Sequence, residues 1–179
     1  MSGLVYYVAA SLDGFIATHQ HALDWLNNFT LGDDATPYDD FYQTVGAVIM
    51  GGTTYCWIIE NFQGEWPYKN VPVFVLTRQF LPTPQELNIA TVSGSATDIA
   101  TLAKSVAADK KVWVVGGGKT AAFFADAGEL SQLQITTIPV FLGSGIPVLP
   151  ADRLIYVKPV SHRILKSGAT EIVLQITGE

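Results

Sequence analysis

The feature that most constrains this chain is a run of three glycines, Gly116-Gly117-Gly118, between an apolar segment and a segment of helical character, Thr120–Asp126. The apolar segment Val112–Val115 is short and continuous, which is typical of a strand buried on both faces of a parallel sheet. Glycines at a strand-to-helix turn let the backbone approach a ligand closely. The free N–H groups of the helix start favour negative charge. The stretch Lys110–Thr120 therefore predicts a binding site for a phosphate or pyrophosphate group. The alternative is a tight turn without a ligand.

Two common nucleotide motifs overlap this run, and neither fits its surroundings. Gly118-Lys119-Thr120 ends like a P-loop, but the spacing of that motif requires a glycine where Trp113 stands. The pattern Gly116-x-Gly118-x-x-Ala121 matches the dinucleotide fingerprint, which also needs an acidic residue about 20 positions further on. Thr136–Pro139 occupies that neighbourhood and has no carboxylate. The phosphate-binding site is therefore expected in a fold other than those of the P-loop and the dinucleotide fingerprint.

Composition limits the classes of protein to which the chain can belong. With 179 residues, 49% hydrophobic and 15% charged, we expect one compact soluble domain over residues 1–179. No apolar run reaches the length of a membrane span, and a signal-peptide pattern is lacking. The single cysteine, Cys56, indicates a reducing cytoplasm. A net charge of −6 argues against nucleic acid as a partner. His19 and His21 have no third ligand at metal spacing, so no metal site is expected.

A second glycine junction precedes the first one in the chain. A buried strand is predicted over Val45–Met50, followed by Gly51-Gly52-Thr53-Thr54 and a helix over Thr53–Phe62. Two such junctions can hold the two ends of one dinucleotide; two ordinary strand-to-helix turns are the alternative.

The next two predicted strands end in polar residues. Thr77-Arg78 follows the strand Val71–Leu76, and Ser93-Gly94 follows the strand Leu87–Val92. An arginine at the carboxyl end of a strand can bind a phosphate through two hydrogen bonds. Arg78 is therefore a candidate phosphate ligand, with a plain surface charge as the alternative.

An acidic residue and an aromatic residue follow the first predicted strand, Leu4–Ala10. Asp13 comes just after this strand, where α/β sheets bind ligands, but Asp13-Gly14 is also an ordinary turn dipeptide. Trp25 is more typical of core packing than of ligand stacking. A helix is expected to begin at Thr36-Pro37, with Thr36 as its N-cap and with Asp39 and Asp40 in its first turn, where they suit the helix dipole.

The remaining part of the chain is predicted to supply a helix, a strand and a terminal hairpin. These elements are a helix over Ala96–Ala108 with Thr97 as N-cap, a strand over Leu133–Val140, and hairpin strands over Leu154–Leu165 and Thr170–Thr177 that turn at Ser167-Gly168. His162 falls inside the hairpin, where a structural role is expected.

In this order, the motifs resemble those of the dihydrofolate reductase fold. The motifs are Ser11-Leu12-Asp13-Gly14, Val48-Ile49-Met50-Gly51-Gly52-Thr53-Thr54, Leu76-Thr77-Arg78 and Val114-Val115-Gly116-Gly117-Gly118. With Pro139-Val140-Phe141-Leu142-Gly143-Ser144-Gly145 and Pro147, the chain is most similar to the deaminase/reductase C-terminal family of riboflavin biosynthesis. The resemblance implies an α/β fold: a mostly parallel twisted sheet flanked by helices, with an antiparallel C-terminal hairpin. The zinc-binding deaminase half of the bifunctional enzyme has no counterpart here.

The resemblance also implies bound NADPH and a set of site residues. Asp13, Asp40 or a water held by one of them is the candidate proton source. In dihydrofolate reductases an acid of the first helix grips the pterin, and no carboxylate here aligns with it. The implied cofactor residues are Ala10, Ile16, Gly51, Gly52, Thr53, Thr54, Thr77, Arg78, Ser93, Gly116, Gly117, Gly118, Lys119 and Thr120, and the implied substrate residues are Trp25, Phe41 and Thr136.

The expected function is therefore NADPH-dependent hydride transfer to a small heterocyclic or ribosylated substrate. The alternative is a nucleotide-binding protein of the same fold without reductase chemistry. The terminal hairpin would leave an apolar edge exposed on a monomer, so a homodimer that buries the hairpin is expected.

Overall fold

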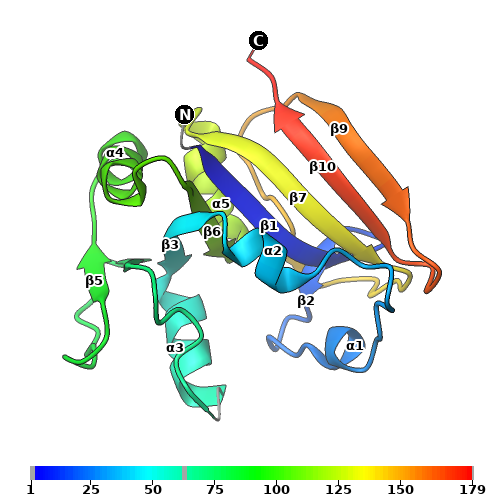
Figure 1. Cartoon of the computed structure of the whole chain (residues 1–179), viewed down its shortest axis with the longest axis horizontal. Coiled ribbons are helices and arrows are strands. Elements are labelled where there is room, and N and C mark those ends of the chain that lie inside the picture. Colours follow the sequence, from blue (N-terminus) through cyan, green and yellow to red (C-terminus); the bar gives the residue numbers. More distant parts are fainter. Residues whose placement is uncertain (1–2, 62–63, 179) are drawn as a thin grey trace.

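A computed structural model describes residues 3–61 and 64–178 of the chain and confirms the expected α/β fold (Figure 1). Its main sheet has eight strands in the order β5-β4-β3-β6-β1-β7-β10-β9, and β2 and β8 form a separate two-stranded sheet. The strands are β1 (Leu4–Ser11), β2 (Phe15–Ala17), β3 (Val45–Gly51), β4 (Val73–Leu76), β5 (Ile89–Val92), β6 (Lys111–Gly116), β7 (Leu130–Ile138), β8 (Ile146–Pro147), β9 (Val157–Ile164) and β10 (Thr170–Ile176). The helices are α1 (Asp24–Asn27), α2 (Tyr38–Tyr42), α3 (Gly52–Asn61), α4 (Ala96–Ala107) and α5 (Gly118–Asp126).

The six strands from β5 to β7 run parallel, because every pairing among them in the sheet order is parallel. β10 then pairs antiparallel with β7 and with β9, as the sequence predicts for the terminal hairpin. The apolar segment before the glycine run is part of β6, between β3 and β1. Its central place explains the continuous apolar pattern, since both of its faces are covered.

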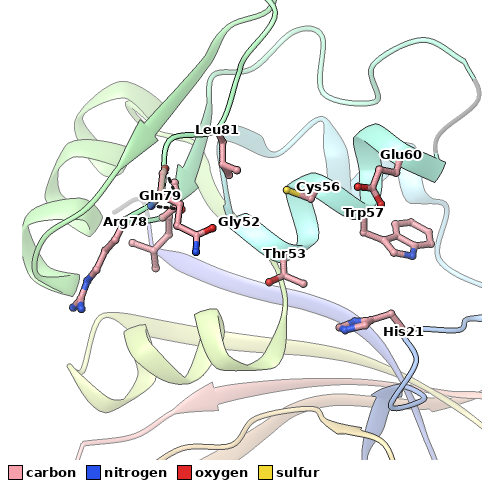
Figure 2. A pocket seen from close by; sticks show the side chains of 11 residues that line it. His21, Gly52, Thr53, Cys56, Trp57, Glu60, Arg78, Gln79 and Leu81 are labelled. Carbon is pink, nitrogen blue, oxygen red and sulfur yellow. Dashed lines mark hydrogen bonds between the residues drawn. The ribbon is translucent and has the colours of Figure 1, made fainter.

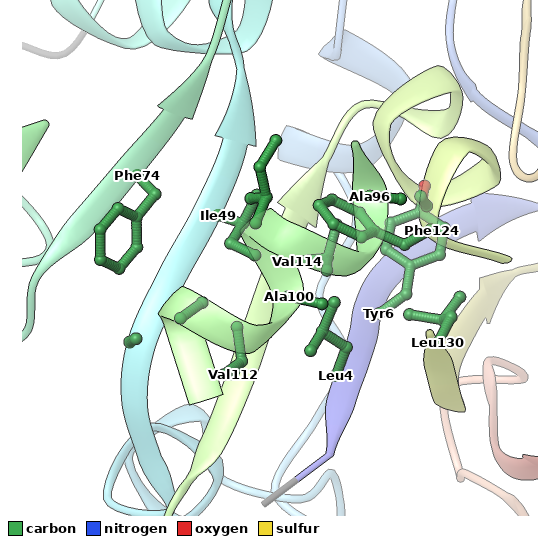
Figure 3. Packing of buried hydrophobic residues seen from close by; sticks show 14 of the residues in the cluster. Leu4, Tyr6, Ile49, Phe74, Ala96, Ala100, Val112, Val114, Phe124 and Leu130 are labelled. Atoms are coloured by element: carbon green, nitrogen blue, oxygen red, sulfur yellow. The ribbon is translucent and has the colours of Figure 1, made fainter. Parts of the chain in front are cut away.

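One face of the sheet packs against α4 and α5. Alternate residues of the central strands, such as Val112 and Val114, point into this layer and have no exposed surface. Phe124 of α5 packs with Tyr6 and Leu4 of β1 in the same cluster (Figure 3). Removing a fully buried phenylalanine such as Phe124 costs about 3–5 kcal/mol in proteins, so this layer holds α5 in place.

The opposite face packs against α2 and α3 through an aromatic cluster. Trp113, between Val112 and Val114 on β6, points to this side and is 6% exposed. Its ring lies 5.3 Å from the ring of Phe41, and its Nε1 donates a hydrogen bond of 3.2 Å to the carbonyl oxygen of Tyr7. The cluster anchors the short helix α2 to the sheet.

Two predicted helix caps are wrong. α2 begins at Tyr38 after Pro37, and the hydroxyl of Thr36 donates a hydrogen bond to Glu171 instead of capping the helix. α4 is capped by Ser95, whose Oγ accepts a hydrogen bond of 3.1 Å from the backbone N–H of Asp98. Thr97, the predicted cap, lies inside α4.

Several predicted boundaries shift by a few residues. α3 starts at Gly52 instead of Thr53 and is described up to Asn61, while the predicted last residue, Phe62, lies outside the described residues. β7 starts at Leu130 and ends at Ile138, so Pro139 and Val140 leave the sheet. In the described part of the chain, no helix combines the length and the apolar character that a membrane crossing requires.

Candidate functional site

The carboxyl ends of four neighbouring strands meet at one edge of the sheet. In the register of the sheet, Gly51 of β3 pairs with Leu76 of β4, and Leu76 pairs with Val92 of β5. Met50 of β3 pairs with Gly116 of β6. Open α/β sheets bind ligands at this edge, outside the carboxyl ends of the strands. The structure therefore brings the two glycine junctions, Thr77-Arg78 and Ser93 to the same edge.

The two glycine junctions touch each other. A Cβ on Gly51 would lie 2.6 Å from Oγ1 of Thr120 in α5, so only glycine fits there without movement. Gly116 has a φ of +140°, a conformation that favours glycine, and its peptide bond to Gly117 is cis. Gly117 caps α5 in an extended conformation without a side-chain hydrogen bond. The starts of α3 and α5 are thus held close together at the sheet edge.

The fold leaves room for a Cβ at Gly117. A Cβ built on Gly117 would have Oγ1 of Thr54 at 3.8 Å and Cδ1 of Ile16 at 3.9 Å as its nearest neighbours. Such distances are ordinary van der Waals contacts, so the protein itself does not require glycine at this position. Ile16, Thr54 and Gly117, which are far apart in the sequence, are brought together here. Because glycine has no Cβ, a ligand can approach the backbone closely at Gly117.

A cavity of about 630 Å³ opens beside the start of α3 (Figure 2). It contains Gly52, Thr53, Thr77 and Arg78, four of the residues expected from the sequence to bind a cofactor. The hydroxyl Oγ1 of Thr77 accepts a hydrogen bond of 3.0 Å from the N–H of Gln79, which fixes the turn that carries Arg78. The full lining is His21, Gly52, Thr53, Cys56, Trp57, Glu60, Leu76, Thr77, Arg78, Gln79 and Leu81.

A second cavity of about 330 Å³ shares Leu76, Thr77 and Arg78 with the first. Arg78 thus lines both cavities. The lining of this cavity is Leu76, Thr77, Arg78, Ser93, Gly94, Lys119, Thr120 and Phe123. Cavities of these sizes are typical of sites for small molecules and cofactors, which commonly measure about 300–1,000 Å³.

Asp13 lies at the carboxyl end of β1, and its carboxylate is occupied by protein donors. Oδ1 accepts hydrogen bonds from Oγ of Ser11 at 2.6 Å and from the N–H of Leu142 at 3.1 Å. Oδ2 accepts a hydrogen bond of 2.7 Å from the N–H of Gly143. The hydrogen bond from the Ser11 hydroxyl lowers the pKa of Asp13 most. Desolvation is the next largest effect and opposes it, and the backbone N–H groups of Leu142 and Gly143 lower the pKa further. Asp13 is therefore held as a carboxylate; its catalytic role stays a prediction.

The other predicted acid and substrate residues do not gather at the cavities. Asp40 is exposed on α2 and lines neither cavity. Phe41 is 6% exposed inside the aromatic cluster, so it offers a substrate almost no surface. Trp25 packs against Ile138 in a small cluster near the end of β7. Thr136, also buried, pairs with Ala9 of β1.

The structure adds cavity residues that the sequence interpretation missed. His21, which the sequence indicated only as unsuited to a metal site, lines the larger cavity together with Cys56, Trp57 and Glu60 of α3. Their i, i+3, i+4 and i+7 spacing with Thr53 could have shown that these α3 residues share a face. No sequence signal places His21 opposite them. Among the described residues, no group of three or more His, Cys, Asp and Glu side chains could hold a metal ion.

Known proteins share this fold, and one relative shares about a third of its aligned residues with this chain. Residues 3–170 match the family described as the RibD C-terminal domain. The chain is 33% identical over 144 residues to the uncharacterised protein YwjB of Bacillus subtilis (strain 168), covering 80% of each chain. A protein of Shewanella sp. PV-4, described as a candidate riboflavin biosynthesis protein, has a TM-score of 0.85 at 24% identity, with 98% of this chain and 99% of that chain covered. Dihydrofolate reductase of Enterococcus faecalis, solved with NADP(H), has a TM-score of 0.66 at 14% identity, with 98% and 97% covered.

Proposed function

The chain belongs to the RibD C-terminal domain family, and on that premise we propose that it is an NADPH-dependent reductase. One observation carries the proposal: the two glycine junctions touch, and they open onto two cavities that share Arg78. A dinucleotide carries phosphate groups along its length, and helix starts and an arginine are suitable partners for phosphates. The family and the NADP(H) of the dihydrofolate reductase that shares the fold support the choice of cofactor.

Each end of the cofactor has suitable residues in this chain. The pyrophosphate suits the backbone N–H groups at Gly52–Thr54 and Gly117–Thr120, where α3 and α5 begin. The 2′-phosphate suits Arg78, with Ser93 and Lys119 in the same cavity. The nicotinamide end suits the apolar surface of Ile16 beside Gly117. Ala10, the last residue but one of β1, is proposed to flank it through the little surface that it exposes, 3%.

The bound cofactor would supply a hydride, so the protein needs to position the reactants and exclude water. Ile16 brings an apolar side chain beside Gly117, which favours a dry contact there. We infer a small heterocyclic or ribosylated substrate from the family alone. Asp13, Asp40 and a water bound to one of them are the candidate proton sources, and of these we propose Asp40 or a bound water, because the Asp13 carboxylate already accepts three hydrogen bonds.

A second function, nucleotide binding without reduction, is favoured by one observation. The carboxylate of Asp13 accepts its hydrogen bonds in the ionised form, and Asp40 lies outside both cavities. Neither acid is therefore poised over the cavities as a proton donor. A protein of this kind would bind NADPH and turn nothing over.

Two measurements on the purified protein test the proposal. NADPH fluorescence is titrated to obtain the dissociation constant, and NADPH oxidation is followed at 340 nm with a panel of pterins, pyrimidines and ribosylaminopyrimidines. Reductase function predicts binding and turnover with at least one substrate class. Binding without turnover on the whole panel supports the second function. Absence of NADPH binding would contradict both.

We further propose that the protein is a homodimer and, from its single cysteine, that it is cytoplasmic. β9 is the last strand of the sheet, and all eight of its residues are exposed. Val160 and Ile164 are 63% and 74% exposed, and Leu154 and Tyr156 just before β9 are 76% and 56% exposed. Apolar side chains on an edge strand are usually covered, and a second copy of the chain is the proposed cover.

A further inference from the structure

Asp13 joins two segments that are about 130 residues apart in the sequence. Its own segment is the turn between β1 and β2, where Ser11 both donates to the Asp13 carboxylate and accepts a hydrogen bond of 2.9 Å from the N–H of Phe15. The other segment contains Leu142 and Gly143, whose N–H groups donate to the two carboxylate oxygens. The carboxylate is therefore a bridge between the β1–β2 turn and the loop before β8.

The segment after Gly143 runs between β2 and the start of α5. β8 pairs with β2, and the N–H of Val148 donates a hydrogen bond of 2.9 Å to the carbonyl oxygen of Gly14. On its other side, the segment packs against Gly118: a Cβ there would overlap the carbonyl oxygen of Pro147 and lie 3.0 Å from that of Val148. The segment 142–148 thus contacts both β2, which carries Ile16, and the first residue of α5.

We propose that Asp13 is a positioning residue that holds the nicotinamide end of the cofactor site in shape by anchoring segment 142–148. This inference rests on the proposed function for the identity of the ligand. The anchored segment contacts both β2 and the α5 start, and it therefore sets the positions of Ile16 and Gly117 relative to each other. Arg78 and Ser93 lie beyond the other end of the site, and the Asp13 contacts do not reach them.

The chemistry of the bridge requires a carboxylate. All three of its partners are donors, and an ionised carboxylate is an acceptor only. An asparagine of the same size would turn its NH₂ group toward at least one of these donors, so one bond would become a contact between two donors. Protonation of Asp13 would have the same effect. The bridge therefore depends on charge as well as on shape.

The test compares two ligands that differ at the nicotinamide end. NADPH reaches both ends of the site, whereas adenosine 2′,5′-bisphosphate has the adenosine and the 2′-phosphate only. We expect Asp13→Asn to weaken NADPH at least tenfold and to leave the bisphosphate affinity within twofold of the unmodified protein. Asp33→Asn is the matched control, because Asp33 is 86% exposed and pairs only with Lys166; both affinities should be unchanged.

The outcomes separate this inference from the proposed function. Unchanged NADPH affinity in folded Asp13→Asn, or an equal loss for both ligands, would overturn the positioning role. If the unmodified protein binds neither ligand, the proposed function fails, and hydrogen exchange of the ligand-free protein decides the anchoring. Faster exchange at residues 15–17 and 142–148, with no change near Arg78, is expected in Asp13→Asn; no difference would overturn it. Ser11→Ala, which removes one donor, should show a smaller effect in the same direction if Asp13→Asn does not fold.

Discussion

Arg163 of β9 and Glu171 of β10 face each other across the terminal hairpin, with Nη2 of the arginine 2.8 Å from Oε2 of the glutamate. The same carboxylate accepts hydrogen bonds of 2.8 Å from the N–H and from the hydroxyl of Thr36. Arg163 also donates a hydrogen bond of 2.7 Å to the carbonyl oxygen of Asp34. The segment before α2 is thereby fastened to the hairpin, and Thr36 serves that contact instead of capping the helix.

Glu171→Gln should lower the free energy of unfolding by about 1 kcal/mol, because neutral hydrogen bonds replace charge-assisted ones. Urea denaturation followed by tryptophan fluorescence measures the change. Lys166→Gln is the control, since the Lys166–Asp33 pair is 76% and 86% exposed and pairs of that kind contribute little. A Glu171→Gln variant as stable as the unmodified protein would show that the charge of Glu171 contributes nothing to the free energy of unfolding.

The same pair predicts a dependence of stability on pH. Partial burial raises the pKa of Glu171, but the hydrogen bonds from Thr36 and Arg163 outweigh burial, so the pKa in the folded protein is lowered. A carboxyl whose pKa is lowered on folding stabilises the protein above its unfolded pKa, about 4.3, and this contribution is lost as pH falls through the folded pKa. The stability difference between the unmodified protein and Glu171→Gln should therefore be constant at pH 6–8 and shrink below about pH 4. A difference that grows toward acid would contradict the lowered pKa.

Two glycine substitutions should have opposite consequences. Gly117→Val adds a Cβ whose nearest neighbours, Thr54 and Ile16, lie at ordinary van der Waals distances, so the fold should survive while NADPH affinity falls at least about tenfold, or about 1.4 kcal/mol. Gly118→Ala puts a methyl group against the carbonyl oxygens of Pro147 and Val148, so thermal stability should fall. NADPH titration and thermal melting of both variants measure these effects. Equal NADPH affinity in folded Gly117→Val would mean that the ligand does not approach this backbone.

Arg78→Ala tests the choice between the two nicotinamide cofactors. If Arg78 binds the 2′-phosphate, NADPH should be weakened by about 1.5–3 kcal/mol while NADH changes little, because NADH has no such phosphate. Fluorescence titration with both cofactors gives the comparison. Lys158→Ala, on the exposed strand β9, serves as the control for loss of a positive charge. Equal losses for NADPH and NADH would assign Arg78 a different role.

The assembly prediction concerns the exposed strand β9. Light scattering behind a sizing column should give twice the chain mass of 19.3 kDa at micromolar concentration. Ile164→Lys adds a charge to a side chain that is 74% exposed in the single chain, so it should split a dimer that covers β9 without unfolding the protein. The chain mass of 19.3 kDa at every loading of the unmodified protein would rule the dimer out.

Local sequence patterns alone determined most of the elements and the two glycine junctions, but not the short elements β2, α1 and β8. The apolar run of β6 and the glycines after β3 and β6 were interpretable because each signal lies within about ten residues, where backbone preferences and burial act directly. The order of these junctions was enough for the family resemblance and for the expected α/β sheet. Parallel strands then bring their carboxyl ends to one edge, as the shared cavity lining at Arg78 shows.

Only the tertiary structure decided what several single residues do. The local sequence predicts Thr36 as a helix cap, but in the fold Thr36 donates a hydrogen bond to Glu171, which is 135 residues away. The local sequence predicts Asp13 as a turn residue or a catalytic acid, but in the fold its carboxylate accepts hydrogen bonds from the N–H groups of Leu142 and Gly143. His21 joins the α3 face across a cavity that no sequence spacing encodes. A side chain's protonation and role follow from the donors and charges around it, and these neighbours come from distant segments that only the folded sheet brings together.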